Sequence, residues 1–259
     1  MVKIKIDLTK SIEENAGIFF EKSKKAKKKL QGALEALKRS QENLEKLKKE
    51  QKIEKERLKE KKPERKKQWY EKFHWFYSSE GFLCIGGRDA TSNEIVIKKH
   101  TDKDDIVFHT EVSGSPFFVV KTEGRTPGQA TLNEAAQATV TYSKAWKLGV
   151  ASIEVFYVAP SQVTKEAKPG EFVPRGAFMI YGKKNYIPSD ISLAVGIKGS
   201  QVIGGPVDAV KANADKFVIV KQGRQKTAAA AKKIRQKLGS GDLDDIIRMI
   251  PAGGCETGG

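Results

Sequence analysis

Cysteine and histidine are scarce in this chain: its 259 residues include two cysteines and three histidines. Two cysteines cannot form a disulfide scaffold or a four-thiolate zinc site, and this favours a reducing intracellular environment. The histidines have none of the HxH, HxxxH or HExxH spacings typical of metal sites. We therefore expect no metal, no cofactor and no catalytic residues, and predict that the chain is not an enzyme.

Long apolar runs are also missing. No run approaches the ~20 apolar residues needed to cross a bilayer, and the opening MVKIKIDLTKS lacks the apolar core of a signal peptide. These features predict a soluble, cytoplasmic protein without a membrane partner. What the chain does have is a formal net charge of +16 and a pI near 9.6. Such a charge indicates an acidic partner, with nucleic acid first and an anionic membrane surface second.

The positive charge is concentrated near the N-terminus. Residues 1–68 hold 23 basic and 12 acidic residues, and within them only Gly17, Gly32 and Pro63 would disfavour a helix. Ser11 and Glu14 have the spacing of a capping box, which predicts a helix start. This composition is typical of a long helix that precedes a globular domain.

Leucines at heptad spacing indicate a coiled-coil arm over residues 11–67. Leu30, Leu37, Leu44 and Leu58 share one heptad position. The seam weakens beyond residue 50, and the highly charged stretch 51–67 is expected to fray into a linker. A partner helix must cover the seam, and it could come from a second copy, another protein or a missing part of a longer chain. The lysine-rich face could be a solvated surface or a nucleic-acid contact.

The rest of the chain predicts an α+β fold with a compact mixed sheet over residues 68–221. The aromatic cluster 69–77 opens it, and a capping box at Thr131 and Glu134 predicts a helix through Gly149. Strands are expected at 82–85, 94–99, 105–111, 117–121, 151–158, 177–181, 192–197 and 216–220. C-terminal helices are expected within 222–251, and residues 252–259 are expected to be a disordered tail.

Basic residues interleaved with aromatic residues are the strongest functional signal. Cations can bind phosphates, and a tyrosine can stack on an unpaired base. The turn at Gly86–Asp89 could be only a tight turn or a backbone contact, and His109 could be structural or RNA-contacting. The predicted RNA-binding residues are Arg88, Lys98, Lys99, His109, Lys144, Arg175, Lys183, Lys184 and Tyr186.

Four long motifs carry a family resemblance. They are WFYSSEGFLCIGGRDATSNE (75–94), DIVFHTEVSGSPFFVVK (105–121), LNEAAQATVTYSKAW (132–146) and GEFVPRGAFMIYGKKNY (170–186). Together they resemble the NFACT-R domain, the RNA-binding module of the ribosome quality-control factors known as NEMF in animals and RqcH in bacteria. The stretch 14–32 is similar to the start of the family's coiled-coil arm. The high lysine content resembles archaeal members.

The resemblance implies a binding role on obstructed large ribosomal subunits. Its implied partners are tRNA and large-subunit rRNA, with ribosomal proteins or a second copy of the chain contacting the coiled-coil arm. The Asp-Arg pair that the family links to tailing of nascent chains belongs to an N-terminal domain without a counterpart here, and Arg88-Asp89 is not that pair. The chain is therefore expected to be a fragment or a shortened member that binds without extending.

Two other functions stay open at this point. The arm could make the chain a protein-interaction scaffold, or the basic domain could bind DNA and other polyanions without specificity. Charge reversal at Lys183 and Lys184 is expected to abolish RNA binding only if the domain contacts RNA.

Overall fold

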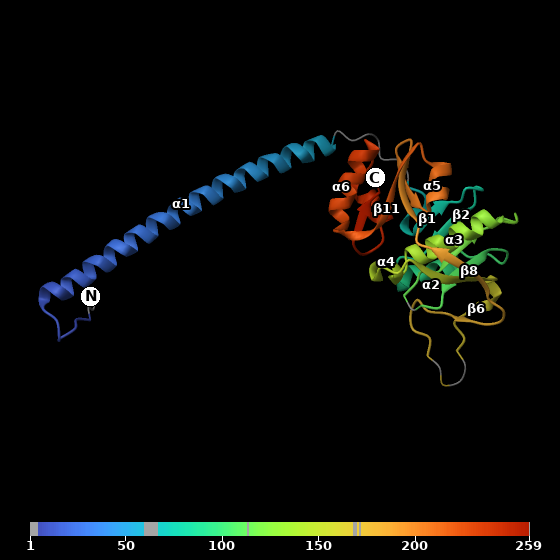
Figure 1. Cartoon of the computed structure of the whole chain (residues 1–259), viewed down its shortest axis with the longest axis horizontal. Helices are drawn as coiled ribbons and strands as arrows, with labels where there is room; N and C mark the ends of the chain where they lie inside the picture. Colours follow the sequence, from blue (N-terminus) through green and yellow to red (C-terminus); the bar gives the residue numbers. More distant parts are fainter. Residues whose placement is uncertain (1–4, 60–66, 113, 168–169, 171, 259) are drawn as a thin grey trace. The chain divides into compact units, whose positions relative to one another are not determined.

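The computed structural model describes residues 5–59, 67–112, 114–167, 170 and 172–258. The chain divides into two compact units, residues 1–66 and 67–259 (Figure 1). The first contains the long helix α1 (Ile12–Lys59), and the second contains all the strands that the structure describes. The predicted α+β class is confirmed. Among the described helices, none is long and apolar enough to cross a membrane.

Helix α1 begins where the capping box predicts. The Glu14 backbone N–H donates to the Ser11 hydroxyl at 3.1 Å, and the Ser11 N–H donates to the Glu14 carboxylate at 2.8 Å. The expected fraying from residue 51 is wrong up to Lys59, because α1 continues to that residue. Residues 60–66 of the predicted linker lie outside the described residues. The seam residues Leu30, Leu37 and Leu44 are each more than half exposed.

A six-stranded antiparallel sheet forms the centre of the second unit. Its strand order is β1-β2-β4-β3-β5-β8, so β8 is an edge strand. Helix α3 (Gln129–Thr141) packs against β3, β4, β5 and β8 through buried alanines such as Ala135 and Ala138. The strands are β1 (His74–Tyr77), β2 (Leu83–Gly86), β3 (Ile106–Thr110), β4 (Phe118–Lys121), β5 (Ser152–Val158) and β8 (Asn185–Asp190).

Between β5 and β8 the chain makes an excursion that contains the short helix η2 (Pro160–Gln162) and a two-stranded sheet. That sheet pairs β6 (Val163–Thr164) with β7 (Met179–Ile180). Phe178 from this excursion packs edge-on against Phe117, at a ring-centroid distance of 5.4 Å. The excursion is therefore anchored to the main sheet by aromatic contacts.

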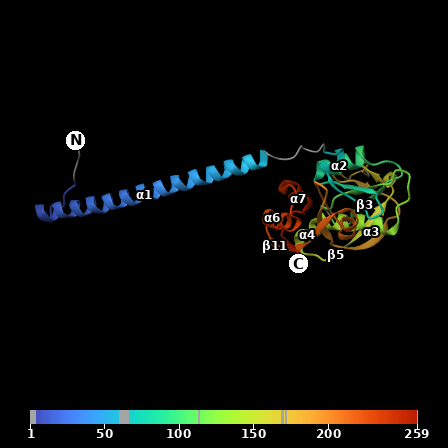
Figure 2. The same ribbon diagram turned by 90° about the horizontal axis from the view of Figure 1, so that it is seen from above.

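A second, four-stranded sheet completes the domain in the order β10-β9-β11-β12. Its strands are β9 (Leu193–Lys198), β10 (Gln201–Gly205), β11 (Lys216–Gln225) and β12 (Cys255–Thr257). A Cβ on Gly204 would meet Met249 of α7, whereas one on Gly196 would meet Val210 of α5. Helix α5 (Val207–Asn213) thus covers one face, while α6 (Thr227–Leu238) and α7 (Leu243–Met249), which contact each other, lie on the other side of β11 (Figures 1 and 2).

Two predicted elements are wrong in type or in starting point. Residues 94–99, predicted as a strand, belong to helix α2 (Ala90–Lys99), because Asp89 caps it by accepting the Ser92 N–H at 2.7 Å.

The central helix begins at Gln129, and the predicted capping box of Thr131 and Glu134 does not form. Thr131 instead contacts Glu80, and Glu134 accepts the Ser79 N–H at 2.9 Å. The central helix ends at Thr141, before the predicted end at Gly149. A separate helix, α4 (Lys144–Leu148), follows, and Ser143 is its N-cap.

Five of the described strands were not predicted as strands: β1, β6, β8, β10 and β12. The stretch around Pro188 is strand β8, since an edge strand tolerates a proline that cannot donate to a neighbour. The strand β10 pairs with β9 across a tight turn at Lys198–Gln201. The predicted disordered tail is wrong at residues 255–257, which form β12 against β11 with Cys255 fully buried.

Candidate nucleic-acid interface

A cross-strand row connects two candidate positions on the main sheet, His109 and Tyr186. His109 on β3 pairs with Phe156 on β5, which in turn pairs with Tyr186 on β8. Residues opposite each other in antiparallel strands share one face of the sheet. The row therefore runs from the interior, where Phe156 is 2% exposed, to the sheet edge, where Tyr186 is 46% exposed.

His109, at the inner end of the row, is held by its own backbone surroundings. Its Nδ1 lies 2.6 Å from the Thr110 carbonyl oxygen and its Nε2 lies 3.2 Å from that of Ser115. The ring also stacks on Phe117 at a centroid distance of 4.1 Å. Burial lowers the pKa of His109, although the two carbonyls act in the opposite direction. These contacts give His109 a structural role, the first of its two predicted interpretations.

At the outer end, Lys184 and Tyr186 share one carboxylate. The Lys184 Nζ and the Tyr186 hydroxyl each lie 2.7 Å from Glu111 Oε1. Hydrogen bonds from these two side chains lower the pKa of Glu111, and the bond to Glu111 raises the pKa of Tyr186. The Lys184 ammonium also lies 4.4 Å from the Phe156 ring centroid. Since Glu111 offsets its charge, Lys184 is less available to a phosphate than the sequence predicts.

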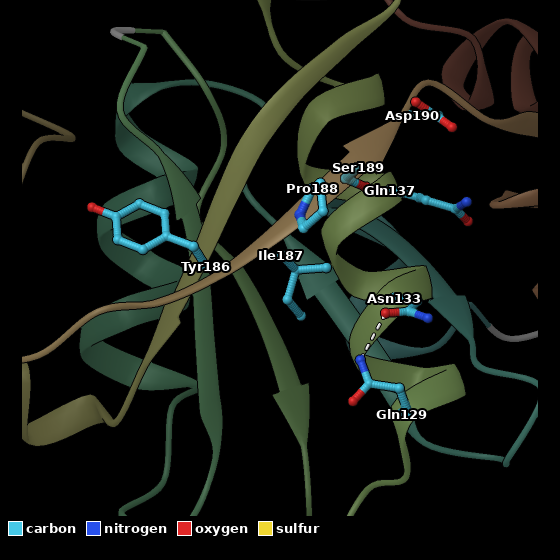
Figure 3. Close-up of a pocket in the computed structure, with 8 residues that line it drawn as sticks. All are labelled: Gln129, Asn133, Gln137, Tyr186, Ile187, Pro188, Ser189 and Asp190. Carbon is cyan, nitrogen blue, oxygen red and sulfur yellow. Dashed lines mark hydrogen bonds between the residues drawn. The ribbon is translucent and has the colours of Figure 1, made fainter.

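A groove of about 430 Å³ lies along the edge strand, between β8 and helix α3. Gln129, Asn133 and Gln137 line it at four-residue intervals, so their carboxamides form a row along one helix face (Figure 3). The Gln129 side chain donates to the Asn133 amide oxygen at 2.8 Å. The Tyr186 ring projects on the other side of β8 from this row (Figure 3). The edge of the sheet thus carries an aromatic ring on one side and neutral hydrogen-bonding groups on the other.

The Arg88 guanidinium forms its hydrogen bonds within the domain. One guanidinium nitrogen donates to the Phe73 carbonyl and another to the Arg248 carbonyl, both at 2.9 Å. Burial lowers the pKa of Arg88. These bonds join the start of β1 to the end of α7, so we leave Arg88 out of the interface that we propose below.

A second group of predicted cations gathers around Glu94 on α2. Lys98 lies 3.8 Å and Lys165 lies 2.6 Å from the Glu94 carboxylate, which also accepts the N–H of Gly176, next to Arg175, at 3.4 Å. Arg175 is exposed and its charge helps to lower the pKa of Asp89. Lys99 is exposed at the end of the same helix. The fold therefore places Lys98 and Arg175 in one region, together with Lys165, which was not predicted.

Lys144 and Lys183 are exposed and come from other elements. Lys144 begins α4 and its side chain lies over Gly114, while Lys183 follows β7 and its carbonyl accepts from the Gln162 amide at 3.0 Å. Trp146, which follows Lys144 on α4, is 2% exposed and donates to the Gly254 carbonyl at 3.1 Å. It belongs to the core.

Metal ligation and thiol chemistry find no support in the part of the chain that the structure describes. No group of three or more His, Cys, Asp or Glu side chains is placed there to hold a metal ion. Both cysteines are buried, and burial raises the pKa of the thiols of Cys84 and Cys255.

Comparison with known proteins identifies the domain. Residues 72–182 match the family model described as the NFACT protein RNA binding domain. The archaeal Rqc2 homolog aRqcH of Methanocaldococcus jannaschii is 39% identical over 199 residues. The chain belongs to the NFACT/NEMF/RqcH family. The resemblance found in the sequence motifs is thereby confirmed.

Other NFACT-family relatives are similar to the same part of the chain. The human ribosome quality control complex subunit NEMF is 37% identical over 175 residues, which cover 67% of this chain and 16% of NEMF. Ribosome quality control complex subunit 2 of Schizosaccharomyces pombe is 38% identical over 131 residues, covering 49% of this chain and 12% of that protein. The aRqcH match covers 74% of this chain and 30% of aRqcH. The chain thus spans less than a third of each relative.

The pattern of cations beside aromatic residues in the sequence did not indicate the carboxamide row or Lys165. The four-residue spacing of Gln129, Asn133 and Gln137 was a readable signal for a polar helix face. Lys165 had no such signal, because its partner Glu94 lies 71 positions earlier in the chain.

Proposed function

We propose that the chain is the RNA-binding module of a ribosome-associated quality-control factor, which contacts tRNA or rRNA on obstructed large ribosomal subunits in the cytoplasm. The match of residues 72–182 to an RNA-binding domain carries this proposal. Relatives named as ribosome quality control subunits support the ribosomal setting. In this proposal the chain binds RNA and catalyses no reaction itself.

The edge strand β8 suits an unpaired RNA strand. Sequence-specific RNA contacts usually involve splayed bases that stack on aromatic rings and form hydrogen bonds with their edges. Tyr186 supplies an exposed ring, and the carboxamides of Gln129, Asn133 and Gln137 can both donate and accept. Lys183 and Arg175, which are both exposed, would bind phosphates.

Replacing Tyr186 tests this interface. The Tyr186→Ala variant should bind a single-stranded oligoribonucleotide roughly tenfold more weakly, because one stacked base contributes ~1–3 kcal/mol. The Tyr186→Phe variant removes the hydroxyl that donates to Glu111 but keeps the ring, and it should bind like the wild type. Fluorescence anisotropy with the full chain measures both. Equal affinities for all three proteins would exclude stacking on Tyr186.

The first comparison is between deacylated tRNA and a generic duplex DNA over a series of salt concentrations. Binding that prefers tRNA and weakens steeply with salt supports the proposal. Equal binding of the DNA would reduce the function to polyanion binding, and no tRNA binding at low salt would contradict it. Lys183→Glu is a better charge reversal than Lys184→Glu, since Lys184 is paired with Glu111.

A scaffold function remains the second candidate, because the heptad leucines of α1 are exposed. Leu30, Leu37 and Leu44 are 62%, 58% and 52% exposed, respectively. A row of exposed leucines on one helix favours contact with another helix. That helix could belong to a ribosomal protein or to a second copy of the chain.

A further inference from the structure

Positive charge is distributed unevenly within the second unit. The segment that matches the RNA-binding family model, residues 72–182, contains 12 basic and 12 acidic residues. The segment 216–238, which lies outside the match, contains eight Lys or Arg and no Asp or Glu. This segment comprises strand β11 and helix α6. The strongest source of positive potential in this unit is therefore outside the family-matched segment.

Helix α6 separates its apolar and basic side chains cleanly. Ala230, Ala231, Ile234 and Leu238 are buried against the sheet. The cations occupy the remaining surface of the helix and are all exposed. We call them, together with the residue that precedes the helix, the α6 basic face: Lys226, Lys232, Lys233, Arg235 and Lys237.

Acidic partners for the α6 basic face are missing among the described residues. None of its five side chains forms an ion pair with a described carboxylate, and Lys237 donates to the Gly258 carbonyl at 2.7 Å. The nearest acids along the chain begin α7, where Asp242 accepts from the α7 backbone and Asp245 lies 3.9 Å from Lys67. Like charges four residues apart on a helix, such as Lys233 and Lys237, repel each other and destabilise the helix. A bound polyanion would remove this repulsion.

We propose that the α6 basic face binds the phosphate backbone of RNA, on a surface separate from the edge strand β8. This inference rests on the proposed function and adds where the electrostatic contacts lie. Membrane-binding helices insert large apolar side chains into the lipid. The large apolar side chains of α6, Ile234 and Leu238, are buried in the domain, and its exposed uncharged residues include only small or polar ones such as Ala228, Ala229 and Gln236. RNA therefore fits this surface better than a membrane does.

The test is a triple variant of the full chain, Lys232→Gln/Lys233→Gln/Arg235→Gln. Glutamine forms helices as well as lysine or arginine does, so the helix should be retained. With a labelled 20-nucleotide oligouridylate, the slope of log K against log salt should fall by ~2, since each single-strand phosphate contact contributes ~0.7. At 0.1 M salt this corresponds to an affinity about a hundredfold lower.

The matched control removes the same number of charges elsewhere: Lys103→Gln/Lys198→Gln/Lys211→Gln. These three lysines are exposed, and Lys211 lies on α5, on the opposite face of the four-stranded sheet. The control should bind nearly as tightly as the wild type. An equal loss in the control would show a diffuse effect of net charge and would overturn the inference, as would an unchanged slope in the triple variant.

The proposed function and this inference can fail separately. If the wild type does not bind the oligouridylate or tRNA at any salt concentration, the proposed function fails. If the wild type binds and the triple variant binds equally well, only the α6 surface is wrong. If the triple variant loses binding to phosphatidylserine vesicles but keeps RNA binding, the α6 basic face binds membranes and not RNA. The Lys232→Arg/Lys233→Arg variant keeps both positive charges and should bind the oligouridylate like the wild type, which would show that charge matters at these positions.

Discussion

At the scale of single residues, burial decides which side chains are available for binding. Arg88 and His109 were both predicted to contact RNA, yet the Arg88 guanidinium donates to two backbone carbonyls and the His109 ring nitrogens lie against two others. Lys183 and Tyr186 are exposed. A sequence shows the residue type at each position but not the direction of its side chain. The structure therefore shows which of the predicted side chains are bonded within the domain, and RNA contact by the others stays a prediction.

Histidine protonation should make stability depend on pH. Burial lowers the pKa of His74, His100 and His109 below the usual value of 6.5. Below about pH 6.5 the unfolded chain binds protons that the folded chain does not. The contribution of these histidines to the free energy of unfolding should therefore be complete above that pH and decrease as the pH falls below it. Urea unfolding at pH 5.0, 6.0 and 7.5 measures this.

His74 provides the matched variant for this effect. Its ring is buried and stacks on Tyr142 at a centroid distance of 3.9 Å. The His74→Phe variant keeps a flat ring there and should lose less stability than the wild type between pH 7.5 and 5.0. If both proteins lose stability equally over this range, His74 does not contribute to the pH dependence.

At the scale of helices and strands, a local signal succeeds where no distant residue competes for its side chains. Ser11 and Glu14 close a capping box as predicted, because both partners lie within one helical turn. The same pattern at Thr131 and Glu134 fails because the 78–80 loop competes for both side chains. Residues 94–99 contain three consecutive β-branched residues (95–97), which favour a strand, but the Asp89 cap and contacts with β2 and β4 select a helix.

Strand β12 should be needed for the stability of the second unit. Deleting residues 254–259 removes the carbonyl that accepts from Trp146 and exposes the edge of β11. A buried donor without a partner costs about 1–3 kcal/mol, so the thermal midpoint should fall by roughly 5 °C or more. Differential scanning calorimetry measures the midpoint. Deletion of Gly259 alone is the control, and an unchanged midpoint in the longer deletion would show that β12 contributes nothing.

At the scale of the whole molecule, the two units present different surfaces. The arm has exposed leucines and many lysines, while the domain combines a charge-balanced family-matched segment with the α6 basic face. In proteins, helices gain most of their stability from packing an apolar face, and the leucines of the arm are exposed. A partner for the arm is therefore expected on physical grounds.

Self-association of the arm can be tested with the full chain. Sedimentation equilibrium at micromolar concentrations should detect a dimer that the Leu37→Asn/Leu44→Asn variant lacks, because polar residues at seam positions weaken pairing. The Lys38→Asn/Glu45→Asn variant has a similar loss of helix propensity off the seam and should still dimerise. A wild type that stays monomeric at all concentrations would indicate a different partner for the leucines.

The sequence by itself determined the α+β class, the start of the arm helix, the family and the basic character of the chain. These properties rest on composition, on contacts within one helical turn and on long motifs. Tertiary structure alone decided that Glu111 pairs with Lys184, that Arg88 joins β1 to α7, and that residues 255–257 form a strand. Each of these depends on partners 15 to 160 positions apart in the chain, and no local pattern encodes where such partners meet.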